Sequence, residues 1–151
     1  VQALEKFLAQ HPQSPDMDLA LLTLGEMKLL LLAPMIVGTR LTVDATNNVA
    51  TNMLQQAITA FTTLVKNHPQ SPLLGKAQLN LGWCLRGLGR FDEARAAFNR
   101  ALELQPNMAE AHWNLSLIGP TGKPDTMSRG MFVTTQRAWI APRAAQHRSG
   151  T

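Results

Sequence analysis

The residue types that could do chemistry in this chain are scattered histidines and a single cysteine. The histidines are His11, His68, His112 and His147. No two of them are four residues apart, as ligands on one face of a zinc-binding helix would be, so we predict no metal site. Cys84 lies within an apolar helical pattern, where a cysteine packs as a small core residue. A single cysteine also excludes a disulfide-stabilised scaffold.

One glycine-rich stretch, Gly119–Lys123, has the sequence GPTGK and resembles the end of a phosphate-binding loop. Such a loop needs another glycine where Leu117 stands, and a serine or threonine to hold magnesium where Pro124 stands. The sequence also suggests no Ser-His-Asp grouping. We therefore predict no catalytic residue, no cofactor and no enzymatic activity.

The amino-acid composition predicts a folded body followed by a basic tail. The chain has 151 residues, of which 45% are hydrophobic and 16% charged, so it has enough apolar surface to bury a core. Residues 1–118 carry equal numbers of basic and acidic side chains, and the net charge of +4 therefore belongs to residues 119–151. A neutral body argues against an RNA-binding protein, because phosphate binding needs surplus cations.

The first residues and the most apolar stretch bear on targeting. Residues 1–10 form an amphipathic segment without a secretion signal, and we expect the chain to be a fragment or a processed form. Residues 19–38 are apolar and about as long as a membrane span, but Glu26 and Lys28 stand near their middle. Charges at that depth are costly, so we predict a helix of a soluble body and no membrane span.

An internal repeat organises the chain. The string HPQSP occurs at His11–Pro15 and again 57 residues later, at His68–Pro72. The same shift superposes Leu24-Gly25 on Leu81-Gly82. Such a match is hard to obtain by chance in a chain this short, so we infer a duplicated structural unit.

Helical periodicity accompanies the repeat. Apolar residues spaced by three and four predict helices at about 2–11, 16–33, 46–67, 73–87, 91–104 and 108–118, and no strands. Ser14 and Ser71 are predicted to cap helices whose first position is a proline. Pro34 is predicted to end the second helix at Ala33, which leaves a long connection up to about Asp44. From Gly119 onward the periodicity stops.

Residues 75–108 resemble a tetratricopeptide repeat, a helix-turn-helix unit of about 34 residues. The family pattern is present as Leu81-Gly82, Ala94, Phe98 and Pro106, whereas Gln78 and Leu85 replace the usual Trp and aromatic residue. The residue sizes fit these family positions. Small Gly82 and Ala94 allow the two helices of one repeat to approach closely, and large Phe98 fills the space between repeats. Weaker copies flank this unit.

The resemblance covers about residues 1–118, roughly three repeats, and implies an all-α fold: a right-handed solenoid of antiparallel helix pairs. We expect residues 119–151 to be an irregular basic tail, either disordered or covering the last helix through apolar residues. Those residues are Met131, Phe132, Val133, Trp139 and Ile140. The HPQSP turns are similar to those of bacterial envelope proteins of the family, so the compartment is left open between the bacterial cytoplasm and the periplasm or envelope.

The resemblance also implies a concave groove, lined by the first helix of each repeat, that binds an extended or helical segment of another protein. Carried onto this sequence, the groove residues are Lys76, Leu79, Asn80, Trp83, Arg86, Glu110, Trp113 and Asn114. Asn80 and Asn114 stand one repeat apart and can hydrogen-bond a peptide backbone. Trp83 and Trp113 are candidate anchors, with packing between helices as the alternative.

The groove residues argue against a ligand with a free C-terminal carboxylate. The family's carboxylate clamp needs Lys and Arg one turn apart, but Lys76 is followed by Asn80 and Glu110 by Asn114. We therefore predict a protein-interaction scaffold, with a non-catalytic recruiting domain of a larger enzyme or assembly machine as the alternative. The partner and the oligomeric state are left open.

Overall fold

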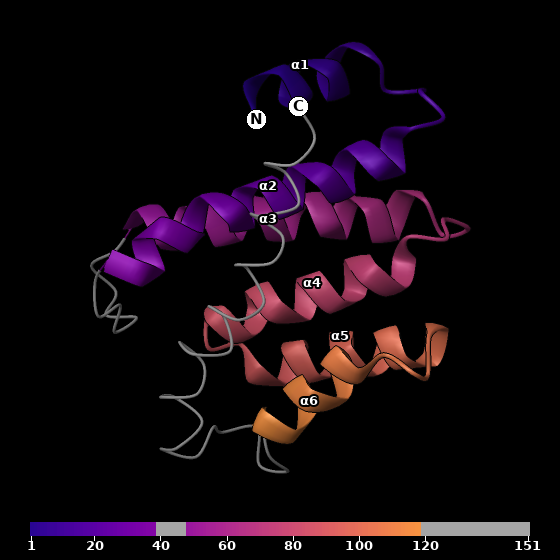
Figure 1. The fold of residues 1–151 in the computed structure, drawn as a ribbon. Coiled ribbons are helices and arrows are strands. Elements are labelled where there is room, and N and C mark those ends of the chain that lie inside the picture. Colours follow the sequence, from indigo (N-terminus) through magenta and orange to yellow (C-terminus); the bar gives the residue numbers. More distant parts are fainter. Residues whose placement is uncertain (39–47, 119–151) are drawn as a thin grey trace, which may run out of the picture.

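The computed structural model describes residues 1–38 and 48–118, and within those ranges it contains six helices and no strand. The helices are α1 (Gln2–Gln10), α2 (Met17–Gly38), α3 (Asn48–Asn67), α4 (Leu74–Gly87), α5 (Phe91–Leu104) and α6 (Ala109–Ile118). Each helix packs against the next one along the chain, which confirms the predicted all-α solenoid (Figure 1). The predicted tail, with His147 and the whole GPTGK stretch, lies outside the described residues.

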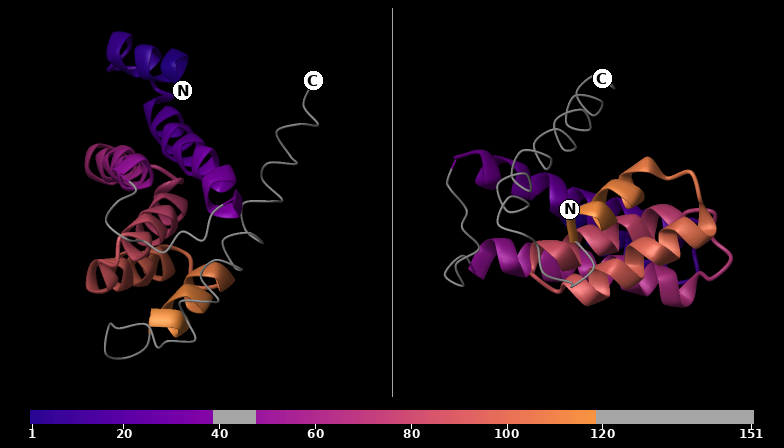
Figure 2. Two further views of the ribbon diagram at one scale, coloured as in Figure 1. Left: turned by 90° about the vertical axis from the view of Figure 1, so that its left-hand side faces the viewer. Right: turned by 90° about the horizontal axis from the view of Figure 1, so that it is seen from below.

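The helices form two layers. In the left view of Figure 2, α3 and α5 lie on one side of the stack, α2 and α6 lie on the other, and α4 lies between them. We call the side of α2, α4 and α6 the inner side, and we call α3 and α5 the outer layer. Within the described ranges, no helix is both long enough and apolar enough to cross a membrane.

The two HPQSP turns start helices in the same way. The Oγ atoms of Ser14 and Ser71 each accept a hydrogen bond from the amide two residues on, at 3.3 Å and 3.1 Å. These bonds close the turn that leads into each helix. The predicted cap is wrong for Ser71, because the residue that precedes α4 is Leu73, which makes no side-chain cap hydrogen bond. The helices begin at Met17 and Leu74, one residue later than the sequence predicts.

The prediction that α2 ends before Pro34 is wrong, because α2 continues through this proline to Gly38. A proline inside a helix forfeits one hydrogen bond, here to the carbonyl of Leu30, yet its fixed φ is close to the helical value. It therefore allows a helix to continue at a cost in free energy. The connection to α3 is correspondingly shorter than expected.

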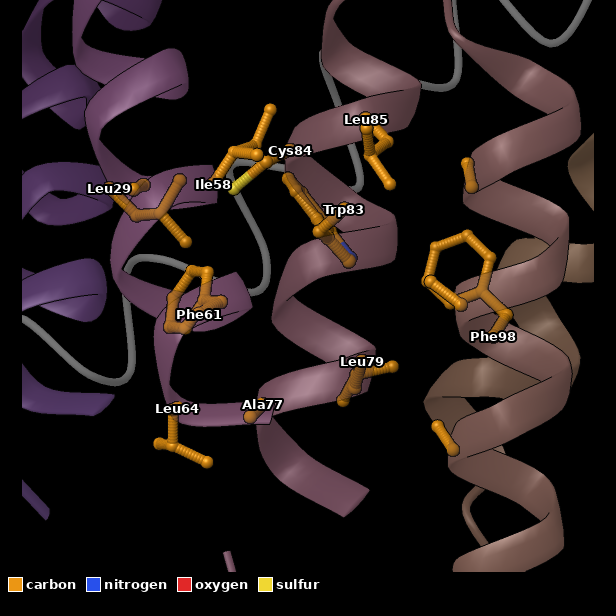
Figure 3. Packing of buried hydrophobic residues seen from close by; sticks show 14 of the residues in the cluster. Leu29, Ile58, Phe61, Leu64, Ala77, Leu79, Trp83, Cys84, Leu85 and Phe98 are labelled. Atoms are coloured by element: carbon orange, nitrogen blue, oxygen red, sulfur yellow. The ribbon is translucent and has the colours of Figure 1, made fainter. Parts of the chain in front are cut away.

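The core repeats one contact between a glycine and a phenylalanine. A Cβ atom added at Gly82 would lie 2.7 Å from Phe98 Cε1, and one added at Gly25 would lie 2.4 Å from Phe61 Cε1. Both phenyl rings are fully buried, and they pack on either side of α4 with Leu64 and Cys84 (Figure 3). The prediction that Gly82 permits close approach of two helices is therefore confirmed. The Phe98 ring packs within its own repeat, against Gly82, and its predicted position between repeats stays a prediction.

A buried lysine attaches α1 to the rest of the stack. Lys28 Nζ lies 2.7 Å from Glu5 Oε1 of α1 and 2.6 Å from Gln56 Oε1 of α3. The Lys28 side chain is 11% exposed, whereas α1 itself has no buried residue. The ion pair with Lys28 and the packing of the half-buried Leu8 against the core therefore hold the first helix in place.

The second HPQSP turn is hydrogen-bonded to α2. Ser71 Oγ donates a hydrogen bond of 2.5 Å to Asp18 Oδ2, and this bond holds the pKa of Asp18 below its ordinary value. A nearby positive charge on His68 lowers the pKa of Asp18 further. A lowered pKa in the folded state stabilises the fold above the unfolded pKa, and this contribution is lost as the pH falls through the folded value.

We expect Ser71→Ala to raise the pKa of Asp18 towards its ordinary value, as measured by NMR titration of its carboxyl carbon. The difference in unfolding free energy between parent and variant should narrow as the solution is acidified through this pKa. The matched control is Ser14→Ala, which removes the equivalent hydrogen bond to the amide two residues on, and its cost in unfolding free energy should not vary over the same pH range. Equal pH dependence of the two variants would contradict the role of Asp18.

Candidate functional site

The candidate groove residues lie on α4 and α6, and they differ in exposure. Five of them are buried: Leu79, Asn80, Trp83, Arg86 and Asn114. The other three can be reached from solvent: the Lys76 side chain is 43% exposed, Trp113 is 45% exposed, and Glu110 is exposed. A partner would therefore first contact these three, with the buried residues beneath or beside them.

Glu26 on α2 contacts two of the candidate groove residues, although it is not among the residues that the sequence predicts for the groove. Its Oε1 atom lies 3.1 Å from Lys76 Nζ and accepts a hydrogen bond of 3.1 Å from Asn80 Nδ2. The internal repeat could have indicated this position, because the 57-residue shift that superposes Gly25 on Gly82 also superposes Glu26 on Trp83, a candidate groove residue. The Glu26 side chain therefore connects the inner helices α2 and α4. It is also one of the two charges that argued against a membrane span.

Arg86 and Asn114 connect α4 to α6. Arg86 Nη1 donates a hydrogen bond of 2.8 Å to Asn114 Oδ1, and Asn114 Nδ2 donates one of 2.7 Å to the carbonyl of Glu110. Burial lowers the pKa of Arg86 to about 10, so the guanidinium stays charged at neutral pH. A buried guanidinium therefore lies between α4 and α6.

The two tryptophans and the two asparagines have different surroundings. Trp83 is 4% exposed and belongs to the hydrophobic core, as the packing alternative for this residue stated, whereas Trp113 is largely open to solvent. Asn80 is fully buried, and within the described part of the chain its Oδ1 atom accepts no hydrogen bond. A buried acceptor of this kind is costly until a donor reaches it.

The chemistry of the remaining polar groups is limited. Cys84 is fully buried, as predicted, and burial raises the pKa of its thiol, which disfavours the reactive thiolate. Across residues 1–38 and 48–118, no group of three His, Cys, Asp or Glu side chains is arranged to hold a metal ion.

Two family models with the description Tetratricopeptide repeat match this chain. One matches residues 20–71, and the other matches residues 49–109 and 85–119, so together they span residues 20–119. Comparisons with curated proteins and with solved structures gave no match. Repeats of this family generally mediate protein–protein interactions and are typically non-catalytic. With its six packed helices, the chain is therefore a member of the tetratricopeptide repeat family.

Proposed function

We propose that the chain is an interaction scaffold that binds an extended or helical segment of a partner protein on the inner side of α4 and α6. The observation that carries this proposal is the exposed ring of Trp113, which lies on the helix whose Asn114 holds the buried Arg86 guanidinium. Tryptophan and arginine are both enriched among the residues that dominate binding energy.

The buried polar groups favour recognition of a peptide backbone. Asn80 and Asn114 occupy equivalent positions in successive repeats, and the Oδ1 atom of Asn80 lacks a donor within the described residues. Because Asn80 is fully buried, an amide N–H of a bound segment would satisfy this oxygen only after the side chains that cover Asn80 move aside. Because backbone amides occur in every peptide, such contacts would contribute affinity without selecting a sequence, and the side chain packed on Trp113 would provide selectivity.

Trp113→Ala is the sharpest test, because the ring is exposed and its loss leaves little cavity in the core. We expect the dissociation constant for a partner captured from source cells to rise about tenfold or more, which corresponds to about 1.4 kcal/mol. Isothermal titration calorimetry with the purified partner measures the change. A melting curve should show that the fold is intact.

The matched control is Leu104→Ala on α5, since Leu104 is 44% exposed but belongs to the outer layer. This variant should bind as tightly as the parent. If Leu104→Ala weakens binding while Trp113→Ala does not, the partner binds the outer layer and the proposed site is wrong.

A further inference from the structure

The last described helix, α6, has a face that no described helix covers. On α4 the equivalent face packs against α5, where Gly82 is buried and touches the Phe98 ring. On α2 the equivalent Gly25 is buried against the Phe61 ring of α3. A shift of one repeat moves this position from Gly82 to Ser116 on α6, and Ser116 is exposed. Among the described helices, α6 is therefore the first helix of a repeat without its second helix.

The helix at the other end, α1, has the opposite half of the same contact. The 57-residue shift between the two HPQSP turns superposes α1 on the second half of α3 and places Leu4 on Phe61. Phe61 and its counterpart Phe98 are fully buried, whereas Leu4 is only partly buried and α1 contains no buried residue. Among the described helices, α1 is therefore the second helix of a repeat without its first helix.

The two residues that lack their contact are complementary in size. In each complete repeat, a glycine of the first helix meets a phenyl ring of the second. In the unpaired helices, Ser116 replaces the glycine and Leu4 replaces the phenylalanine, so one side gains a hydroxymethyl group while the other loses part of a ring. Exchanges that roughly conserve the total volume are the ones that packed interiors tolerate best.

The Ser116 hydroxyl does not prevent an apolar side chain from packing over it. It is turned back to its own helix, where it donates a hydrogen bond of 2.7 Å to the carbonyl of Trp113. Because the hydroxyl already has a partner, a leucine can cover Ser116 without burying an unpaired polar group.

The positions of α1 and α6 decide which copies of the chain can supply the contact. The two helices lie at opposite ends of the stack, so they cannot pair within one copy (Figure 1). A second copy can bring its α1 to the open face of α6, and the stack then continues from α6 into α1 and α2 of that copy. Such a contact is head to tail, and every joined pair leaves one α1 and one α6 open for a further copy.

We propose that the chain associates with itself head to tail, with α1 of one copy packed on the open face of α6 of the next. Leu4 then contacts Ser116 of the neighbouring copy in the way that Phe98 contacts Gly82 within a complete repeat. Because α1 has 9 residues and α6 has 10, the contact is small, and we expect weak and reversible association. This proposal does not depend on the partner-binding site on the inner side.

Sedimentation velocity of the full chain, from about 1 µM to about 1 mM, tests the association. We expect the average mass to rise with concentration beyond that of a dimer, because a head-to-tail contact leaves both ends open. Leu4→Asp and Ser116→Asp each place a charge in the contact and should weaken self-association about tenfold or more. The matched control is Gln2→Asp, which makes the same charge change on α1 at a position whose counterpart, Thr59 on α3, is exposed.

A mixture of the two blocked variants tests the head-to-tail geometry. The Leu4→Asp chain keeps an intact α6 face, and the Ser116→Asp chain keeps an intact α1. Mixed in equal amounts, they should form a dimer with one copy of each variant, and growth should stop there because both outer ends carry the added aspartate.

Three outcomes would overturn the proposal. A parent chain that stays monomeric over the whole concentration range would show that no second copy covers α6. If the Leu4→Asp chain still forms dimers as readily as the parent, α6 pairs with another α6 and the contact is symmetric. A mixture that remains monomeric while the parent associates would show that the copies meet through some other surface. Melting curves should show that each variant is folded, since Ser116 is exposed and α1 contains no buried residue.

Discussion

Phe98→Ala is expected to lower the free energy of unfolding by about 3–5 kcal/mol, the usual cost of removing a fully buried phenyl ring. Phe98 is 0% exposed and touches Gly82 of α4 from its position on α5. The close packing around the ring prevents α4 and α5 from collapsing into the space it leaves. Urea unfolding followed by circular dichroism measures the change.

Leu104→Ala serves as the control, because it shortens an exposed apolar side chain on the same helix. Its cost should stay below about 1 kcal/mol. Phe61→Ala should match Phe98→Ala, since Phe61 is equally buried and makes the equivalent contact with Gly25. A small effect of Phe98→Ala with a large effect of Leu104→Ala would contradict the burial of Phe98 and the exposure of Leu104.

Gly82→Leu should destabilise the protein for the opposite reason, because it adds atoms where none fit. The Cβ alone would lie 2.7 Å from Phe98 Cε1, and the leucine branches would extend further into the space of the ring. Overpacking costs about 1–3 kcal/mol, and this site belongs at the upper end because the neighbouring atoms belong to a buried ring that cannot swing away. Thermal unfolding should show a lower melting temperature.

Two further variants separate this steric clash from other effects of replacing a glycine. Gly75→Ala is the matched control on α4, since its nearest contact is the flexible Gln105 side chain at 3.0 Å, and it should leave the melting temperature unchanged or raised. Combining Gly82→Ala with Phe98→Leu should recover part of the stability that Gly82→Ala alone loses. Strictly additive losses in that pair would show that the two residues do not interact.

Most of the fold could be predicted from the sequence because local and repeated signals agree. Spacings of three and four located five of the six described helices to within two residues, and the family pattern identified Gly82 as a point of close approach between two helices. The error at Pro34 came from treating a local preference as decisive. A proline makes a helix end more favourable, but the apolar run before it continues as helix to Gly38.

The candidate site was harder to predict because burial depends on how helices pack. The sequence placed Trp83 and Trp113 on equal terms, but Trp83 is in the core and Trp113 is exposed. Periodicity shows which residues share a face, not how closely the next helix covers it. The contact of Glu26 with Lys76 and Asn80 joins residues more than 40 apart in the chain, and only the 57-residue shift hinted at it.

The two glycine–phenylalanine contacts are the same, although their partners are separated by very different lengths of chain. Phe61 follows Gly25 by 36 residues, whereas Phe98 follows Gly82 by 16. Doubling the length of a connection costs only about 0.6 kcal/mol in loop-closure entropy, which a buried phenyl ring readily outweighs. The stretch between α2 and α3 is therefore the natural place to insert foreign sequence, such as an epitope or a second recognition module, into this scaffold.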